Sequence, residues 1–141
     1  MEQEIFTRMK VKTAGQGLVV NAPDTYPPHS FTVYGGEANG PYPFIHVFVR
    51  SREDFKAYVP AVSALLAGGG LFWISYPKGS AKTRPDINRD SLWDLVIPQG
   101  FHPVAQIALD ETWSAVRLKP NEKGAAYVRP VRAPVPPARK R

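Results

Sequence analysis

The sequence contains no cysteine. This absence excludes disulfide bonds, thiolate catalysis, and the zinc and iron–sulfur sites that depend on cysteine ligands. No apolar run approaches the roughly 20 residues that a membrane-spanning helix needs. The first residues, Met1-Glu2-Gln3-Glu4, are acidic and begin no apolar segment of the secretory signal type. We therefore expect a soluble, cytoplasmic protein with no membrane partner.

Acidic residues are absent from Ala125 to the end of the chain, although the net charge of the whole sequence is +6. Five of the 18 basic residues lie in this stretch, which leaves 13 basic residues against 12 acidic ones elsewhere. The excess charge is therefore mostly a property of a basic, proline-rich tail, which we expect to be flexible over residues 121–141. The basic residues of the tail are Arg129, Arg132, Arg139, Lys140 and Arg141.

The length of 141 residues suits one domain. The pattern predicts an N-terminal extension over residues 1–13 and a small Rossmann-like α/β domain over residues 14–120. The apolar run Phe44–Val49 is typical of a parallel strand that is covered on both faces. Ser51 and Asp54 then form an approximate capping box for a helix that ends at the glycine triplet 68–70.

The other expected elements continue the alternation of strands and helices. We expect a first strand at 16–22, a short edge strand or loop at 31–34, and a second buried strand at 71–76. A second helix is expected at 87–97, and residues 104–109 and 113–118 should form an antiparallel hairpin. The predicted fold class is thus a mostly parallel sheet with helices on its faces and a C-terminal antiparallel hairpin.

This order of elements, with the turn Gly68-Gly69-Gly70-Leu71-Phe72-Trp73, resembles the second half of class I methyltransferases that use S-adenosylmethionine. Four further segments together resemble a family of small uncharacterised bacterial proteins, a domain of unknown function. That second resemblance implies no activity, so it assigns no catalytic residue. The four segments are Val20–Pro23, Trp73–Lys78, Asp86–Asp90 and Asp110–Trp113.

The loop between the strand at 71–76 and the next helix is a candidate anion site. Ligands of open α/β sheets bind beyond the carboxyl ends of strands, and the N-terminus of a helix favours anions. The alternative interpretation is an ordinary exposed basic loop, since the phosphate-binding pattern Gly-x-x-x-x-Gly-Lys-Ser/Thr is absent. The candidate residues are Lys78, Gly79, Ser80, Lys82, Thr83 and Arg84.

No cofactor and no metal is expected from the remaining motifs. We interpret the glycine triplet as the end of a helix. The stretch Asn21–Pro28, where a cofactor loop would follow the first strand, contains three prolines that lack N–H donors. His46 is interpreted as a core histidine with satisfied hydrogen bonds. Asp86, Asp90 and Asp94 are interpreted as a cap and a solvated helix face, so no catalytic residue is assigned.

Three hypotheses for function follow. The leading one is a non-catalytic binding or interaction module that engages an anionic small molecule or a protein partner through Lys78–Arg84. The alternative is a nucleic-acid-associated protein that uses the basic tail. The second alternative is a divergent transferase-like enzyme, with Asp86, Asp90 or Glu111 in a pocket.

Overall fold

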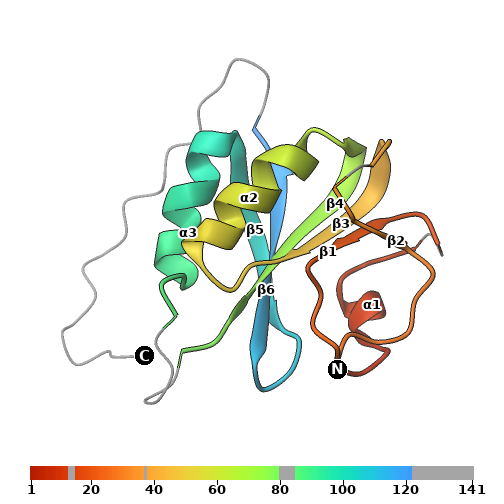
Figure 1. Cartoon of the computed structure of the whole chain (residues 1–141), viewed down its shortest axis with the longest axis horizontal. Helices are drawn as coiled ribbons and strands as arrows, with labels where there is room; N and C mark the ends of the chain where they lie inside the picture. Colours follow the sequence, from red (N-terminus) through yellow and green to blue (C-terminus); the bar gives the residue numbers. More distant parts are fainter. Residues whose placement is uncertain (13–14, 37, 80–84, 122–141) are drawn as a thin grey trace.

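A computed structural model describes residues 1–12, 15–36, 38–79 and 85–121 of the chain. Its strands form one six-stranded sheet in the order β2-β1-β3-β4-β6-β5 (Figure 1). The strands are β1 (Leu18–Val20), β2 (Thr32–Val33), β3 (Tyr42–Phe48), β4 (Leu66–Pro77), β5 (Phe101–Ala108) and β6 (Trp113–Pro120). The helices in the described residues are α1 (Ile5–Arg8), α2 (Arg52–Ser63), α3 (Arg89–Val96) and the short 3-10 helix η1 (Ile97–Gln99).

The sheet is mostly parallel, which confirms the predicted α/β fold class. β2, β1, β3 and β4 pair in parallel, whereas β6 pairs antiparallel with both β4 and β5. The predicted C-terminal hairpin is therefore confirmed, and it begins at Phe101, three residues earlier than expected. No helix within the described residues is long and apolar enough to pass through a membrane.

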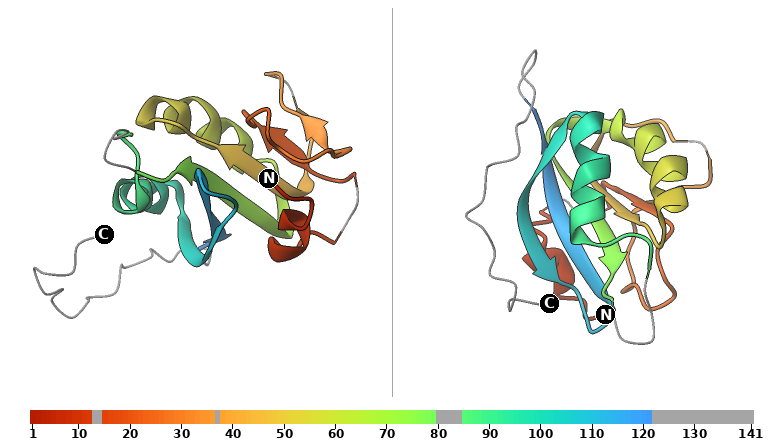
Figure 2. Two further views of the ribbon diagram at one scale, coloured as in Figure 1. Left: turned by 90° about the horizontal axis from the view of Figure 1, so that it is seen from below. Right: turned by 90° about the vertical axis from the view of Figure 1, so that its left-hand side faces the viewer.

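One face of the sheet is covered by α2 and α3 (Figures 1 and 2). The Ser51 side chain accepts a hydrogen bond from the backbone N–H of Asp54 at 3.1 Å and so starts α2, as the sequence predicts. Asn88 starts α3 with a capping box to Ser91. The buried side chains that α2 and α3 direct toward the sheet are Phe55, Val59, Val62, Leu92 and Val96.

The N-terminal segment and the loop after β1 cover the opposite face. Residues 1–13 were expected to precede the α/β domain, and within this segment Ile5 and Met9 are fully buried against the sheet. The indole Nε1 of Trp73 donates a hydrogen bond to the backbone oxygen of Met9 at 3.0 Å. This buried bond joins the N-terminal segment to the centre of β4, and α1 lies across the sheet from α2 (Figure 2).

The glycine triplet does not end a helix, so this prediction is wrong. Helix α2 ends at Ser63, and Gly68, Gly69 and Gly70 lie inside the first half of β4. The register between β3 and β4 shifts here, because Tyr42 pairs with Leu66 while Phe44 pairs with Leu71. The glycines accommodate this irregularity: Gly69 has a positive φ of 76°.

His46 is fully buried in the middle of β3, and both of its ring nitrogens are hydrogen-bonded. Nδ1 lies 3.0 Å from the Tyr26 hydroxyl and Nε2 lies 2.7 Å from the Ser75 hydroxyl. The interpretation of His46 as a satisfied core histidine is confirmed. Burial lowers the pKa of His46 to about 3 and raises the pKa of the Tyr26 phenol.

Because the pKa of His46 is about 3 in the folded protein and about 6.5 when unfolded, acid should destabilise the protein. Above pH 6.5 both states are neutral at this residue, and between pH 6.5 and pH 3 only the unfolded state takes up the proton. Stability should therefore fall by about 1.4 kcal/mol per pH unit in this window. Urea unfolding at pH 7 and pH 4.5 should show a smaller loss for His46→Gln than for the wild type. Equal losses would contradict the assignment.

Gly70 should tolerate no side chain, whereas Gly68 should. A Cβ at Gly70 would lie 2.9 Å from the Ala67 carbonyl oxygen and 3.1 Å from the Pro43 carbonyl oxygen, so the backbone would have to move. A Cβ at Gly68 meets nothing within 4 Å. We expect Gly70→Ala to destabilise the fold by about 1–3 kcal/mol, while the matched control Gly68→Ala changes stability by less than about 0.5 kcal/mol. Urea unfolding midpoints measure both, and equal midpoints would contradict this account.

Candidate functional site

The sheet has a topological switch between β1 and β3. From β1 the chain passes outward to β2, and after returning to β3 on the other side of β1 it passes to β4 in the opposite direction. Ligands of open α/β sheets bind at such a switch, beyond the carboxyl ends of the strands. The residues at this position are Asn21, Arg50, Asp54 and Trp113, which we call the strand-end cluster.

Asn21 follows the last residue of β1 and joins the ends of two strands. Its φ of 60° lies in the left-handed region, which asparagine tolerates better than most residues. The side-chain amide donates to the backbone oxygen of Phe48, at the end of β3, at 3.0 Å. It also donates to the Asp54 carboxylate at 3.4 Å, so the end of β1 is tied to the first turn of α2.

Arg50 contacts both sides of this junction. Its backbone N–H donates to the Asp54 carboxylate at 2.8 Å, and its Nη1 donates to the backbone oxygen of Asn21 at 3.2 Å. The guanidinium carbon lies 5.2 Å from the centre of the Trp113 ring, close enough for a cation–π interaction. The side chain is exposed, so backbone and ring contacts hold a charged group at the surface in a defined position.

The cluster can bind an anion. A guanidinium has five N–H donors in a planar fork that matches a carboxylate or a phosphate. Within the described residues, Arg50 uses one of these donors, toward Asn21. The Asp54 carboxylate already accepts two hydrogen bonds, so it orients its neighbours. Arg50 is therefore the group in this cluster that can contact a ligand.

The predicted anion loop is described only at its start. Lys78 donates from Nζ to the backbone oxygen of Asp110 at 2.7 Å, which ties it to the turn between β5 and β6. Gly79 is exposed beside it. Ser80, Lys82, Thr83 and Arg84 lie outside the described residues, and so do the five basic residues of the tail. Both predicted sites therefore stay predictions.

The acidic candidates do not converge on one site. The Asp86 carboxylate accepts a hydrogen bond from the backbone N–H of Arg52 at 2.9 Å, so it satisfies the first turn of α2. Asp90 lies in the first turn of α3, and Glu111 is exposed in the turn before β6. Within residues 1–12, 15–36, 38–79 and 85–121, no three histidine, aspartate or glutamate side chains group closely enough to hold a metal ion.

Sequence reasoning missed the strand-end cluster. Asn21 was considered as part of the first strand, of a segment shared with an uncharacterised family and of a proline-rich stretch, Asp54 as part of a capping box, and Arg50 not at all. The available signal was positional, because Arg50 follows the predicted strand 44–49 and Asn21 lies near the end of the predicted strand 16–22, the two strands between which the chain reverses its direction across the sheet.

The loop after β1 does not fit a cofactor that needs a glycine-rich turn. Pro23, Pro27 and Pro28 have no N–H donor, and the backbone N–H of Tyr26 donates to the Pro23 oxygen at 3.0 Å. The Tyr26 side chain is turned inward to His46. This loop therefore offers few backbone N–H donors to an adenosyl or dinucleotide cofactor.

Comparison with solved structures supports the methyltransferase-like topology. The chain is similar to the glycopeptide N-methyltransferase MtfA, with a TM-score of 0.56, 12% identity, and coverage of 82% of this chain and 88% of that one. It is similar to a ribosomal protein L11 methylase from Lactobacillus delbrueckii subsp. bulgaricus, with a TM-score of 0.53, 6% identity, and coverage of 86% and 81%. It is also similar to LepI in complex with SAM, with a TM-score of 0.51, 10% identity, and coverage of 84% and 39%.

No protein-family model and no curated protein sequence matches the chain. The resemblance to a small uncharacterised bacterial family therefore stays a prediction, while the likeness to methyltransferases holds at the level of the fold. The leading hypothesis of a non-catalytic module is contradicted, because similar structures include methyl-transferring enzymes. The second alternative, a transferase-like protein, agrees better with these similarities.

Proposed function

We propose that this chain is a divergent transferase-like enzyme whose substrate or group donor binds by an anionic group to Arg50 of the strand-end cluster. The observation that carries the proposal is an exposed guanidinium held at the carboxyl ends of β1 and β3, at the switch of the sheet. The likeness of the fold to methyltransferases supports a group-transfer reaction.

The surroundings of Arg50 favour ligand binding over a purely structural role. The contacts with Asn21 and Trp113 orient the guanidinium before a ligand arrives, which reduces the entropy lost on binding. A charge-assisted hydrogen bond from arginine to a carboxylate or phosphate contributes about 1.5–3 kcal/mol. Arg50 therefore acts as an anchor, and the transferred group would lie farther along the same edge of the sheet.

Several common group donors carry an anionic group of the kind that a guanidinium binds. S-adenosylmethionine carries a carboxylate, whereas acetyl coenzyme A and ATP carry phosphates, and a guanidinium binds both kinds of group. The loop after β1 lacks the backbone N–H groups that a glycine-rich turn would offer to a cofactor. Binding of these three molecules therefore has to be compared directly.

Binding of these donors should depend on Arg50. We expect at least one of S-adenosylmethionine, acetyl coenzyme A and ATP to bind the intact protein in isothermal titration calorimetry. The variant Arg50→Gln should bind that donor about tenfold more weakly, since a lost contact of about 1.4 kcal/mol is a factor of ten. Arg8→Gln is the matched control, because Arg8 is an exposed arginine on α1, outside the cluster.

Two results would overturn this proposal. One is that Arg50→Gln and Arg8→Gln bind the donor as tightly as the wild type. The other is that none of the three donors binds and none is consumed when the protein is incubated with it. Thermal unfolding of both variants checks that neither substitution unfolds the chain.

A further inference from the structure

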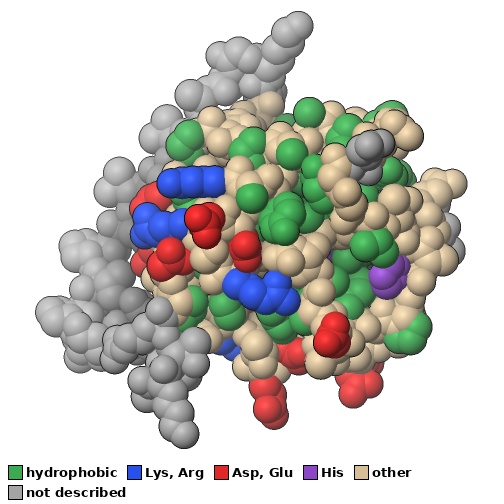
Figure 3. All heavy atoms as spheres, viewed as in Figure 1, with side chains coloured by type: hydrophobic (Ala, Val, Ile, Leu, Met, Phe, Trp, Pro, Cys, Tyr) green, Lys and Arg blue, Asp and Glu red, His purple; other side chains and the backbone are tan. Residues whose placement is uncertain are grey.

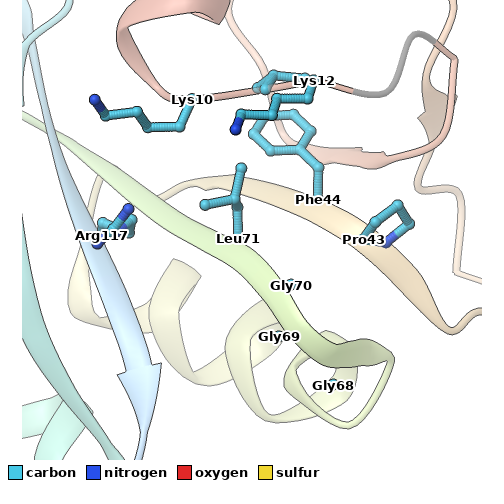
Figure 4. Close-up of a pocket in the computed structure, with 10 residues that line it drawn as sticks. Lys10, Lys12, Pro43, Phe44, Gly68, Gly69, Gly70, Leu71 and Arg117 are labelled. Carbon is cyan, nitrogen blue, oxygen red and sulfur yellow. The ribbon is translucent and has the colours of Figure 1, made fainter.

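A pocket lies at the opposite end of the parallel strands from the strand-end cluster, and the proposed function does not use it. Its volume is about 440 Å³. It opens between the N-terminal segment, the first residues of β3 and β4, and β6 (Figure 4). We call it the amino-end pocket, because it lies where β3 and β4 begin, whereas the strand-end cluster lies beyond the point where β3 ends.

Among the described residues, three cations and no acidic side chain line the amino-end pocket: Lys10, Lys12 and Arg117. Figure 4 shows the two lysines extending from the N-terminal segment and Arg117 extending from β6 on the other side of Leu71. By contrast, on the face that carries α2 and α3, basic and acidic side chains lie side by side (Figure 3). Like charges gathered without a counter-charge repel each other, and a bound anion would relieve this repulsion.

Arg117 combines a place in the pocket lining with a buried donor that no described residue satisfies. Its Nε atom is buried, yet it has no hydrogen-bond partner among the described residues. A buried donor without a partner costs about 1–3 kcal/mol. Arg117 pairs in register with Trp73 across β6 and β4, so the strand pairing fixes the position of its backbone at the pocket. The Arg117 side chain therefore lines the same pocket as the two lysines, while its Nε atom is itself enclosed by protein.

Lys10 has a backbone conformation that is unfavourable for a lysine. Its φ of 68° is left-handed, a conformation that follows many helices and that glycine or asparagine usually adopts. The backbone N–H of Lys10 donates to the Thr7 oxygen at 3.0 Å, and that of Val11 donates to the Phe6 oxygen at 2.9 Å. A lysine therefore occupies the position after α1 at some cost in stability, and its side chain reaches the pocket (Figure 4).

The rest of the lining is apolar or bare backbone. Val11 and Leu71 provide partly exposed apolar surface, the buried Phe44 lies behind them, and the Gly68–Gly70 backbone leaves the far side without side chains. A bare inorganic ion would leave this apolar surface in contact with water, whereas an organic anion would cover it.

We propose that the amino-end pocket binds a small organic anion, with a phosphate-type group between Lys10, Lys12 and Arg117 and an apolar body over Val11 and Leu71. This site is separate from the strand-end cluster and does not depend on the proposed transferase function. A 440 Å³ pocket suits a single small molecule, and so the ligand is distinct from a nucleic acid strand.

Phenyl phosphate is a suitable probe, because it joins a phosphate to an apolar ring. In isothermal titration calorimetry with the full chain, phenyl phosphate should bind more tightly than inorganic phosphate, and phenol more weakly than either. Lys12→Gln and Arg117→Gln should each weaken phenyl phosphate about tenfold. Lys56→Gln, which removes an exposed cation from α2 on the other face, should leave binding unchanged.

Lys10→Gly separates binding from folding. Glycine adopts the left-handed conformation without strain, so this variant should unfold at a higher temperature than the wild type while binding phenyl phosphate more weakly. A general loss of structure cannot produce this combination, because it would lower the unfolding temperature as well.

Four outcomes would overturn the proposal. The first is that phenyl phosphate binds no better than inorganic phosphate, or does not bind at all. The second is that every pocket variant binds phenyl phosphate as tightly as the wild type, which would show that the pocket is not the binding site. Weakening by Arg50→Gln in place of the pocket variants would assign the ligand to the strand-end cluster. Tighter binding of a short oligonucleotide than of phenyl phosphate, lost in the same variants, would assign the cations to a nucleic acid.

Discussion

The burial of β3 and β4 on both faces is the constraint on which the rest of the structure depends. Residues 44–48 of β3 are all buried, so each face of the sheet needs a covering layer. Two helices cover one face, whereas α1 and the loop after β1 cover the other. The polar groups of this second layer must satisfy each other, which accounts for the chain of hydrogen bonds from Tyr26 through His46 to Ser75.

The same arrangement separates the two candidate binding regions. The strand-end cluster forms where β1 and β3 finish and α2 begins, because Asp54 of the first helical turn reaches back to Asn21 and Arg50. The amino-end pocket forms where the N-terminal segment crosses the start of β3 and β4. The hydrogen bond between Trp73 and Met9 fixes this segment over the sheet, and thereby places Lys10 and Lys12.

The sequence predicts the elements that depend on local signals. Ser51 predicts the start of α2, and the apolar run after Pro43 predicts β3, since capping and continuous burial are visible over a few residues. The glycine triplet was wrongly interpreted as the end of a helix, because glycines that end a helix and glycines that bend a strand look alike in sequence. Neither candidate region was predicted, because Arg50 with Trp113, and Lys10 with Arg117, are distant in sequence and come together only through the sheet.

The two edge strands of the sheet affect how readily this chain aggregates at high concentration. β2 has only two residues, both exposed, and it offers a short row of backbone groups for another strand to join. At the other border, β5 contains Pro103, which lacks an N–H donor, and its register shifts between Pro103 and Ala105. Both borders are thus poor templates for the edge-to-edge pairing that leads β-sheet proteins to aggregate, which leaves the buried strands protected in the middle.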